Sequence, residues 1–570
     1  MNLLCQSLMI FFEWISFWVK RGLMRVWRVF PTLSPWTATS GVTNEVSYQA
    51  ESEEWKTSEE RRTFILGDKD VTMVTVQTST HAFYVDLRKL SDCSEYFQAL
   101  SQSTMKETSE NLIHLDHVSS SIFYHLLEFS FHNRFKVPQE ELGAHIQVRE
   151  SNFNVDCADT MLCFNTPLSC VALFVFFEVS SYLLAEAFLS KCLLVLAKQL
   201  SPDNCLFYLN LAQEICCEEL RATVFTYLSR NLLELPHLIS CLDSDNVKEL
   251  IRLRTQGDQC LCSLRKENLT SWDDPETERA RYIFTLNTSE IGSHWQPVSE
   301  LPFHADKWCF TTVVLFNYLY IIGGHRQHVR KAWEFKMASF RYNPFTLTWV
   351  ATAPLIKRRR HFSAVACEGC IYALGGWYLG SLVTPDSSTA LYTAVECYNP
   401  WTDTWRFVSS LPITDFQFTM SLSHDVPLAT SLGHCVYVLG SIQRTGEKLL
   451  LQYNTRQDSW CELLPTLTRT DANLSILYFL GATDRLFVIG GNNAEILLTS
   501  FCVRTQKWGK VHRADKAAFA GQGTVLGDQV LMPSIEHNTV AKMDLQTLSM
   551  SVLPPFPVSA HYEAIFHLHF

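Results

Sequence analysis

The sequence predicts a multi-domain chain in which an α/β module, an all-α module and an all-β module follow one another. Its 570 residues correspond to three or four domains at about 150 residues each. Apolar residues make up 47% of the chain and charged residues 18%, a composition that supports buried cores. A repeat with a period of about 50 residues fills the C-terminal half. The net charge of −11 provides no basic face for nucleic acid phosphates, so we expect no nucleic acid as a partner.

Residues 1–62 are expected to be a variable extension that belongs to no domain. Residues 3–19 are mostly apolar and aromatic, but they include Gln6 and Glu13. This stretch is shorter than the about 20 apolar residues of a transmembrane helix. Its basic residues follow it, whereas a cleaved signal carries them first. A signal-anchor helix is the alternative interpretation, and we expect no membrane partner.

The α/β module is predicted over residues 63–190. Alternating apolar residues at 70–76 indicate a strand, and residues 83–90 indicate a hairpin return. Tyr96, Phe97 and Leu100 fall on one face of a helix. A short strand at 113–115 and another helix at 123–129 follow. This order of elements predicts a small sheet packed against helices.

An atypical insert, residues 148–178, interrupts this module. Without it, residues 140–147 run directly into residues 179–185 as one helix-compatible stretch. The insert begins with Val-Arg and ends in a Phe-rich tract, which is how a retained intron can look when it is translated. We hold the retained intron as a hypothesis that transcripts joining the flanking codons would support. The insert would then interrupt a helix beside the partner-binding surface.

The all-α module is predicted over residues 191–268. Amphipathic stretches at 180–196, 204–215 and 218–231, separated by short connections, indicate three packed helices. Taken alone, these stretches predict only a helical bundle.

The all-β module is predicted over residues 269–570 because four aromatic motifs recur there. In each motif a Tyr or Phe is followed seven residues later by Trp, at 342–349, 398–405, 453–460 and 501–508. A β-branched or aromatic run that ends in small residues precedes each motif. The steps between successive tryptophans from Trp295 to Trp508 are 54, 56, 55 and 48 residues. This is the spacing of the blades of a Kelch-type β-propeller, in which large aromatic residues pack between neighbouring sheets.

Two weaker units complete the predicted propeller, for which we expect six blades. Residues 530–534 and 543–550 have the outline of a repeat that has lost its Gly pair and its Trp. Residues 282–287 with Trp295 indicate the outer strands of another blade, and residues 561–570 are expected to supply its inner strand. Pairing the first and last strands in this way closes the ring and removes exposed edges.

Together these modules resemble the Kelch-like family. Residues 63–147 resemble a BTB domain, and the helices that follow resemble the end of a BTB domain and a BACK module, with Asn204 and Cys217 near the family's usual positions. Kelch-like proteins commonly act as substrate-recognition adaptors of cullin-3 ubiquitin ligases. The resemblance implies a homodimer through the BTB domain, cullin-3 as a partner and a protein substrate on the propeller. It also implies a cytoplasmic protein, with nuclear or cytoskeletal locations as alternatives.

The resemblance implies which residues of the BTB domain contact the cullin. Met105 and Glu107 match the hydrophobic-x-Glu element of that contact. Tyr96 and Phe97 are expected beside it. The alternative is that Phe97 belongs to the core and that Glu107 is a solvated carboxylate.

The resemblance also implies a charged pair near the dimer interface. Asp70 and Arg88 match the positions of that pair, and an ordinary surface pair is the alternative. A buried pair of this type would specify the dimer more than it would stabilise it.

Substrate contacts of the propeller are expected in the loops at one of its faces. The densest basic run, residues 357–361, contains Arg358, Arg359 and Arg360, whose forked side chains suit an acidic or phosphorylated segment. The alternative is the family's usual basic residue and His at this turn, with solvated neighbours. Trp377 and Tyr378 follow a Gly pair and are predicted aromatic anchors.

Catalysis and metal binding are not predicted. The sequence contains no phosphate-binding Gly loop, no Gly-x-Ser-x-Gly turn and no His-Glu-x-x-His helix. Its 19 Cys lack the spacing of a disulfide framework or of a zinc site, and its 19 His form no ligand set like that of the copper-binding Kelch oxidases. We therefore expect reduced thiols and no cofactor.

Two other functions compete with the adaptor role. One is a dimeric scaffold on actin or other cytoskeletal filaments, and the other is a BTB transcriptional co-regulator.

Overall fold

The chain divides into two compact units, residues 1–228 and residues 229–570. The computed structural model describes residues 63–64, 73–102, 111–133, 177, 179, 182–214, 216–267, 281–289, 292–302, 308–327, 333–335, 337–359, 362–378, 390–391, 393–412, 416–418, 428–442, 448–463, 475–491, 495–515, 519, 521–534, 536–547, 549–557 and 562–570.

The first unit begins with a four-stranded sheet. The strand order is β1 (Thr63–Phe64), β3 (Ala82–Asp86), β2 (Met73–Thr78) and β4 (Leu112–Leu115). Strands β2 and β3 are antiparallel, while β1 and β4 run parallel to their neighbours. Helices α3 (Leu87–Cys93), α4 (Glu95–Gln102) and α6 (Ser120–His132) contribute Leu90, Phe97 and Phe123 to its core. The predicted α/β class is confirmed.

The predicted hairpin strand at 83–90 is four residues too long. Strand β3 ends at Asp86, whose carboxylate accepts a hydrogen bond from the backbone N–H of Arg88 at 3.0 Å. An Asp in this position caps the first turn of a helix, so residues 87–93 form α3 in place of a strand.

Three further helices follow: α9 (Glu186–Gln199), α10 (Cys205–Glu214) and α11 (Glu218–Arg230), of which the last two residues, Ser229 and Arg230, already belong to the second unit. They correspond to the three predicted stretches, although α9 begins six residues later than predicted. The delay follows from Leu184, whose positive φ of 48° cannot belong to a regular helix. Phe177, at the end of the insert, is fully buried with its ring 6.4 Å from that of Tyr208. The rest of the insert lies outside the described residues.

The second unit starts with helices α12 (Pro236–Ile239) and α13 (Ser244–Leu253) and continues into antiparallel sheets that we number as blades in chain order. Blade 1 contains β33 (Tyr562–His569), β5 (Gln259–Glu267), β6 (Tyr282–Ser289) and β7 (Gly292–Glu300). Blade 2 contains β8 (Trp308–Leu315), β9 (Tyr318–Gln327), β11 (Ser339–Asn343) and β12 (Thr348–Thr352), with β10 (Trp333–Phe335) on the far end of β9. Blade 3 contains β13 (Ser363–Cys367), β14 (Cys370–Leu374), β17 (Val395–Asn399) and β18 (Thr404–Val408).

The remaining sheets repeat this plan in the described residues. Blade 4 contains β20 (Leu428–Leu432), β21 (Cys435–Ile442), β22 (Lys448–Asn454) and β23 (Ser459–Leu463), with β19 (Phe416–Phe418) on β21. Blade 5 contains β24 (Ser475–Ala482), β25 (Arg485–Gly491), β26 (Glu495–Cys502) and β27 (Lys507–Trp508), with β28 (His512–Asp515) on β26. Blade 6 contains β29 (Thr524–Leu526), β30 (Gln529–Ser534), β31 (Thr539–Asp544) and β32 (Met550–Val552). The predicted all-β propeller class is confirmed.

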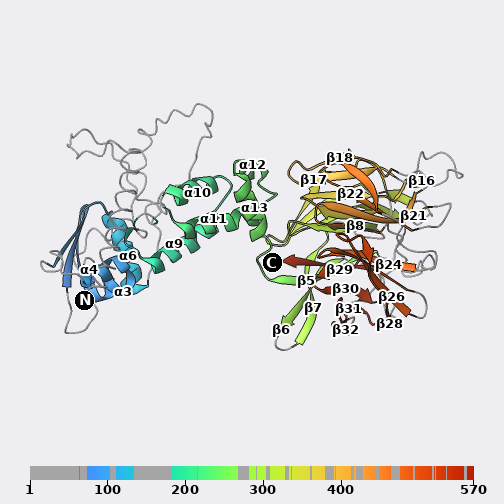
Figure 1. Ribbon diagram of the computed structural model, residues 1–570. Coiled ribbons are helices and arrows are strands. Elements are labelled where there is room, and N and C mark those ends of the chain that lie inside the picture. The colour runs from blue at the N-terminus through green and yellow to red at the C-terminus, as the bar shows by residue number, and fades with distance from the viewer. Residues whose placement is uncertain are drawn as a thin grey trace, which may run out of the picture. The chain divides into compact units, whose positions relative to one another are not determined.

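Blade 1 is closed by the C-terminal strand, as the sequence predicts. Strand β33 pairs antiparallel with β5 from Tyr562 to His569 (Figure 1). This pairing corrects the predicted module boundary at residue 268, because β5 (Gln259–Glu267) is a propeller strand and not part of the helical module. Strand β5 carries no Gly pair and no Trp, so it lacks the motif by which the other blades are identified.

The repeated aromatic residues pair directly across the outer hairpins of blades 2 to 5. Tyr342 lies opposite Trp349 with ring centroids 4.9 Å apart. The equivalent pairs in blades 3, 4 and 5 are separated by 5.1, 4.9 and 5.2 Å: Tyr398–Trp405, Tyr453–Trp460 and Phe501–Trp508. The seven-residue spacing therefore follows from a four-residue turn between two strands in fixed register.

In blade 3, two polar contacts join the outer hairpin to blade 2. The indole N–H of Trp405 donates to the carbonyl of Ala353 at 3.0 Å. Asp403, in the same turn, accepts from the hydroxyl of Tyr398 at 2.7 Å and from the backbone N–H of Ala353 at 2.9 Å. Blade 4 repeats the arrangement with Trp460, Asp458, Tyr453 and Ser409. Each Asp has a φ of 49°, in the left-handed region that Asp tolerates better than most residues.

Blade 2 carries Leu347 where blades 3 and 4 carry these aspartates. Leu347 has a φ of 55°, is 53% exposed and cannot accept a hydrogen bond from Tyr342. Replacing Leu347 by Asp is expected to raise the free energy of unfolding by about 1–2 kcal/mol, because it relieves the left-handed Leu and supplies the missing acceptor. Urea unfolding followed by tryptophan fluorescence measures the change. The matched variant Asp403→Leu should lose about the same amount, and a loss in both variants would contradict this account.

Candidate functional site

The first candidate site lies at the N-terminus of α4 in the first unit. Phe97 is fully buried, with its ring 6.3 Å from that of Phe123. Its predicted role as a cullin contact is therefore corrected: this side chain belongs to the core and does not reach a partner. Tyr96 is half-buried and packs edge-on against Phe97 with ring centroids 5.1 Å apart. Met105 and Glu107 lie outside the described residues.

Tyr96 belongs to an aromatic cluster that sequence reasoning missed. The ring of Tyr182 lies 5.9 Å from that of Tyr96 and 4.5 Å from the imidazole of His117. Tyr182 is 40% exposed and Leu184 beside it 42% exposed. Burial raises the pKa of Tyr182, and burial lowers the pKa of His117 despite the nearby carboxylate of Asp116, so both side chains are neutral at pH 7. We call Tyr96, His117, Tyr182 and Leu184 the aromatic cluster.

Backbone and side-chain contacts hold the aromatic cluster in place. The hydroxyl of Ser94, just before α4, donates to the carbonyl of Leu183. The backbone N–H of Glu95 donates to the carbonyl of Leu184 at 3.3 Å. These bonds bring segments about 90 residues apart in sequence together, which is why no local pattern signalled the cluster. Its exposed, neutral aromatic surface suits an apolar anchor from a protein partner.

Of the predicted dimer pair, the structure describes only Arg88. Arg88 is about half exposed, and its Nε lies 3.5 Å from the carboxylate of Asp86, which is buried as the cap of α3. Asp70 lies outside the described residues. The dimer role of Asp70 and Arg88 therefore stays a prediction.

The second candidate site, the basic run of the propeller, is smaller than predicted. Arg359 is completely buried and is paired at 2.6 Å with Glu396, which is also completely buried. The same guanidinium donates to the carbonyls of Ala373, Gly375 and Ala394. Its predicted role in substrate binding is corrected, because the Arg359 side chain is held by groups of blade 3 and no part of it reaches solvent.

Of the other predicted substrate residues, the structure describes Arg358, Trp377 and Tyr378. Arg358 is exposed, as is Lys357 before it. Trp377 and Tyr378 form β15, which pairs with β16 (Ala390–Leu391) and continues the hairpin of blade 3 beyond its Gly pair. Arg360 lies outside the described residues.

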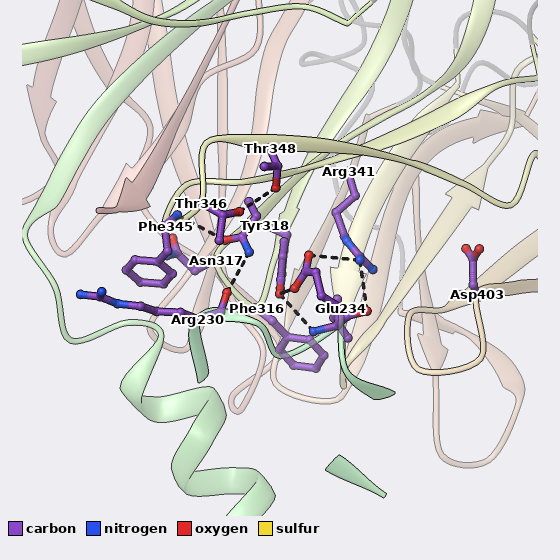
Figure 2. A network of polar contacts seen from close by, with 12 residues as sticks. Arg230, Glu234, Phe316, Asn317, Tyr318, Arg341, Phe345, Thr346, Thr348 and Asp403 are labelled. Carbon is purple, nitrogen blue, oxygen red and sulfur yellow. Dashed lines mark hydrogen bonds and ion pairs between the residues drawn. The ribbon is translucent and has the colours of Figure 1, made fainter. Parts of the chain in front are cut away.

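A buried polar network joins the helical start of the second unit to blade 2. Figure 2 shows Glu234 between Tyr318 and Arg341, and its carboxylate accepts from the Tyr318 hydroxyl at 2.6 Å and from Arg341 at 3.2 Å. The backbone N–H of Leu233 donates to the same Tyr318 hydroxyl at 3.1 Å. Asn343 donates to the carbonyl of Arg230 at 2.8 Å. These contacts bind the segment between α11 and α12 to strands β9 and β11.

Arg254, at the end of α13, is the most deeply buried charge of this network. Its guanidinium lies 3.8 Å from the ring centre of Tyr318. It donates to four carbonyl oxygens, those of Phe316, Asn317, Ser229 and Arg230, and to the side-chain oxygen of Asn343. An Arg side chain offers five N–H donors in a fixed plane, so it suits a pocket walled by carbonyl groups. Sequence reasoning missed Arg254 because nothing in its local sequence separates it from the exposed Arg252.

A cavity of about 510 Å³ lies among the innermost strands of the blades. The residues that line it include Thr312, Ser363, Thr430, Gln522 and His567. Gln522 links three blades here, because it accepts from Thr312 at 2.9 Å and from Lys266 at 3.3 Å. Burial lowers the pKa of His567 to about 4, so its ring is neutral at pH 7.

Comparisons with known proteins support the BTB and Kelch assignments. The BTB/POZ domain family model matches residues 67–163, and the Kelch motif family model matches residues 358–412. The chain thus contains a BTB domain followed by helices and Kelch repeats. Its predicted resemblance to the Kelch-like family is confirmed.

Three curated relatives carry matching names. The chain is 27% identical to Kelch domain-containing protein 7A of Mus musculus over 265 residues, 46% of this chain and 30% of the relative. It is 27% identical to Kelch-like protein 36 of Bos taurus over 35% of this chain and 30% of the relative. It is 22% identical to Kelch repeat and BTB domain-containing protein 2 of Homo sapiens over 70% of this chain and 69% of the relative. The matched segments span less than a third of the length of the first two relatives.

One solved structure, entitled "Structure of YjhT", is similar to 48% of this chain and 91% of its own length, at 13% identity and a TM-score of 0.36.

Within the described ranges, none of the helices combines the length and the apolar character of a transmembrane span. In the same ranges, no three His, Cys, Asp or Glu side chains come together as ligands for a metal ion.

Replacing Arg254 by Met is expected to lower the free energy of unfolding of the second unit by about 3–5 kcal/mol, because it leaves buried carbonyl groups and Asn343 without their donor. Urea unfolding of the full chain measures the loss. The matched control is Arg252→Met, two residues earlier on the same helix and exposed, which should change stability by less than about 0.5 kcal/mol. Equal losses in the two variants would show that the network contributes nothing.

Stability is expected to fall as the pH falls from about 6.5 to about 4, because the unfolded chain protonates His567 in this range while the folded protein keeps it neutral. The contribution of this histidine is about 3 kcal/mol over the window. Chemical unfolding of the full chain at a series of pH values measures it. His567→Asn should flatten the pH dependence, and His537→Asn, at an exposed position, should leave it unchanged.

Proposed function

We propose that this chain is a substrate-recognition adaptor of a cullin-3 RING ubiquitin ligase. The BTB domain binds the cullin and dimerises, and the propeller binds the protein to be ubiquitinated, so the chain itself is a non-catalytic subunit that works in the cytoplasm. The observation that carries this proposal is the aromatic cluster, an exposed and neutral surface on the BTB half of a chain that also contains Kelch repeats. The names of the relatives support the class of protein.

Within this proposal the residues take separate roles. Tyr96 and Tyr182, together with Met105 and Glu107, contact the cullin, and Asp70 and Arg88 lie at the dimer interface. On the propeller, Arg358 and Arg360 provide positive charge, and Trp377 and Tyr378 provide aromatic anchors for the substrate. Arg359 positions the turn that carries Arg358, because its partner Glu396 also accepts from the backbone N–H groups of Ile356 and Lys357 at 2.8 and 3.3 Å.

Affinity purification of the full chain from cells tests the proposal by the amount of cullin-3 recovered. Tyr182→Ala, and separately Met105→Ala with Glu107→Ala, should reduce recovery at least ten-fold, since truncating an interface anchor typically costs about 2 kcal/mol or more. Tyr84→Ala is the matched control, because Tyr84 is a tyrosine of the same unit that is 51% exposed and outside the aromatic cluster. Recovery of actin without cullin-3 from the unmodified chain would reject the adaptor in favour of the scaffold.

A further inference from the structure

The face of blade 2 that packs against blade 3 carries buried hydrogen-bond donors without an acceptor. Arg341 on β11 lies directly opposite Tyr320 on β9, so both side chains lie on the same face of the sheet. The ring of Tyr320 packs 5.8 Å from that of Tyr398 in blade 3. Tyr320 is 1% exposed and Arg341 is 6% exposed. Among the described residues, neither the Tyr320 hydroxyl nor Nε of Arg341 has a hydrogen-bond partner.

Two further hydroxyl groups on this face are also unsatisfied. Ser339 lies two residues from Arg341 on β11, and Thr352 lies directly opposite Ser339 on β12, so both share the face of Arg341. Their hydroxyls are buried and have no partner in the described part of the chain. Burial raises the pKa of Tyr320, so its hydroxyl keeps its proton and remains a donor. Since about 90% of buried polar groups in proteins have a partner, four such groups on one face indicate a missing acceptor.

The charges beside these donors do not balance. Nη2 of Arg341 donates to Glu234 and to the carbonyl of Leu233, each at 3.2 Å. The guanidinium of the fully buried Arg254 lies 3.8 Å from the ring centre of Tyr318, and that of Arg341 lies 5.0 Å from the same ring. Within the described ranges, Glu234 is the carboxylate that these two guanidinium groups share. A buried positive charge in excess is costly unless an anion accompanies it.

The arginine is particular to blade 2. The tyrosine opposite it belongs to the repeat, because Tyr372 and Tyr437 take the same position in blades 3 and 4. The residues opposite this position in blades 3, 4 and 5 are not basic: Cys397, Gln452 and Ser500. The propeller geometry therefore does not require an arginine here. The contact of Arg341 with Glu234 uses Nη2 and leaves Nε–H directed elsewhere.

We propose that a monovalent anion of the size of chloride binds in the seam between blades 2 and 3, where Nε–H of Arg341 and the hydroxyl of Tyr320 donate to it. The hydroxyls of Ser339 and Thr352 lie at the next position along the strands and face the same seam. An anion accepts several hydrogen bonds at once and also balances the second guanidinium, whereas a buried water supplies no negative charge. This inference does not rest on the proposed ligase function. The bound anion stabilises the second unit.

Urea unfolding of the full chain, followed by tryptophan fluorescence, tests this site with chloride as the probe. Sodium gluconate replaces sodium chloride at constant ionic strength, so that the screening of surface charges stays the same. Raising chloride from zero to about 150 mM is expected to raise the urea midpoint by about 0.5 M, the shift for a ligand at roughly ten times its Kd. Tyr320→Phe removes one donor and should lose at least half of this shift. Tyr437→Phe is the matched control, because Tyr437 is also buried at the same position of blade 4, and it should keep the full shift.

Bromide locates the anion in the unmodified chain, so this second measurement does not depend on how the variants fold. Crystals grown in sodium bromide should show an anomalous diffraction peak between Nε of Arg341 and the hydroxyl of Tyr320. A urea midpoint that does not change with chloride, a shift that both tyrosine variants keep in full, or a seam without a bromide peak would each overturn the proposal.

Discussion

Every blade of this propeller must bury both faces of its sheet against its neighbours, and this constraint governs the second unit. A single blade cannot bury two apolar faces by itself, so the ring is stable only when it is closed and side chains fill each seam, the interface between two neighbouring blades. The closing blade combines β33 from the C-terminal end with β5 to β7 from the beginning of the unit. The same seam is fixed to blade 2, because Asn317 exchanges two hydrogen bonds of 2.8 Å with the backbone of His569. Asn317 also links this closure to helix α13, because its backbone carbonyl accepts a hydrogen bond from Arg254.

The seams explain why the sequence predicted the propeller so well and the individual site residues less well. A Tyr and a Trp seven residues apart are required by the register of one hairpin, so the requirement is local and repeats with each blade. The burial of Arg359 depends on Glu396, which is 37 residues away, and on the carbonyl groups of Ala373, Gly375 and Ala394. A basic run in the sequence gives the same signal whether its members face solvent or a buried carboxylate. The aromatic cluster has the same non-local origin, because it unites segments at residues 94–96, 117 and 182–184.

The two fully buried arginines, Arg254 and Arg359, follow one physical rule. A guanidinium is difficult to bury because its charge needs an acceptor for each donor, and a propeller supplies such acceptors where strands end and their carbonyl groups lose sheet partners. Arg254 uses these carbonyls at the hairpin of blade 2, and Arg359 uses them at the Gly pair of blade 3. The buried carboxylate of Glu396 neutralises Arg359, so this pair adds no net charge to the surface. The positive surface that the sequence suggests near residue 359 is thus reduced by one charge, and an acidic substrate would meet fewer cations than the run implies.

Blade 6 shows how far the repeat can degenerate while its seams stay filled. Its outer hairpin places Met543 opposite Met550, in the positions where other blades carry an aromatic residue and Trp. The seam to blade 1 is filled from the other side, because Trp295 packs against Phe556 with ring centroids 5.1 Å apart and donates to the carbonyl of Pro554 at 3.0 Å. Apolar area at the seam is therefore kept while the motif residues of blade 6 are lost. What the fold requires is a filled seam between blades, and the Gly pairs and tryptophans are one means of filling it.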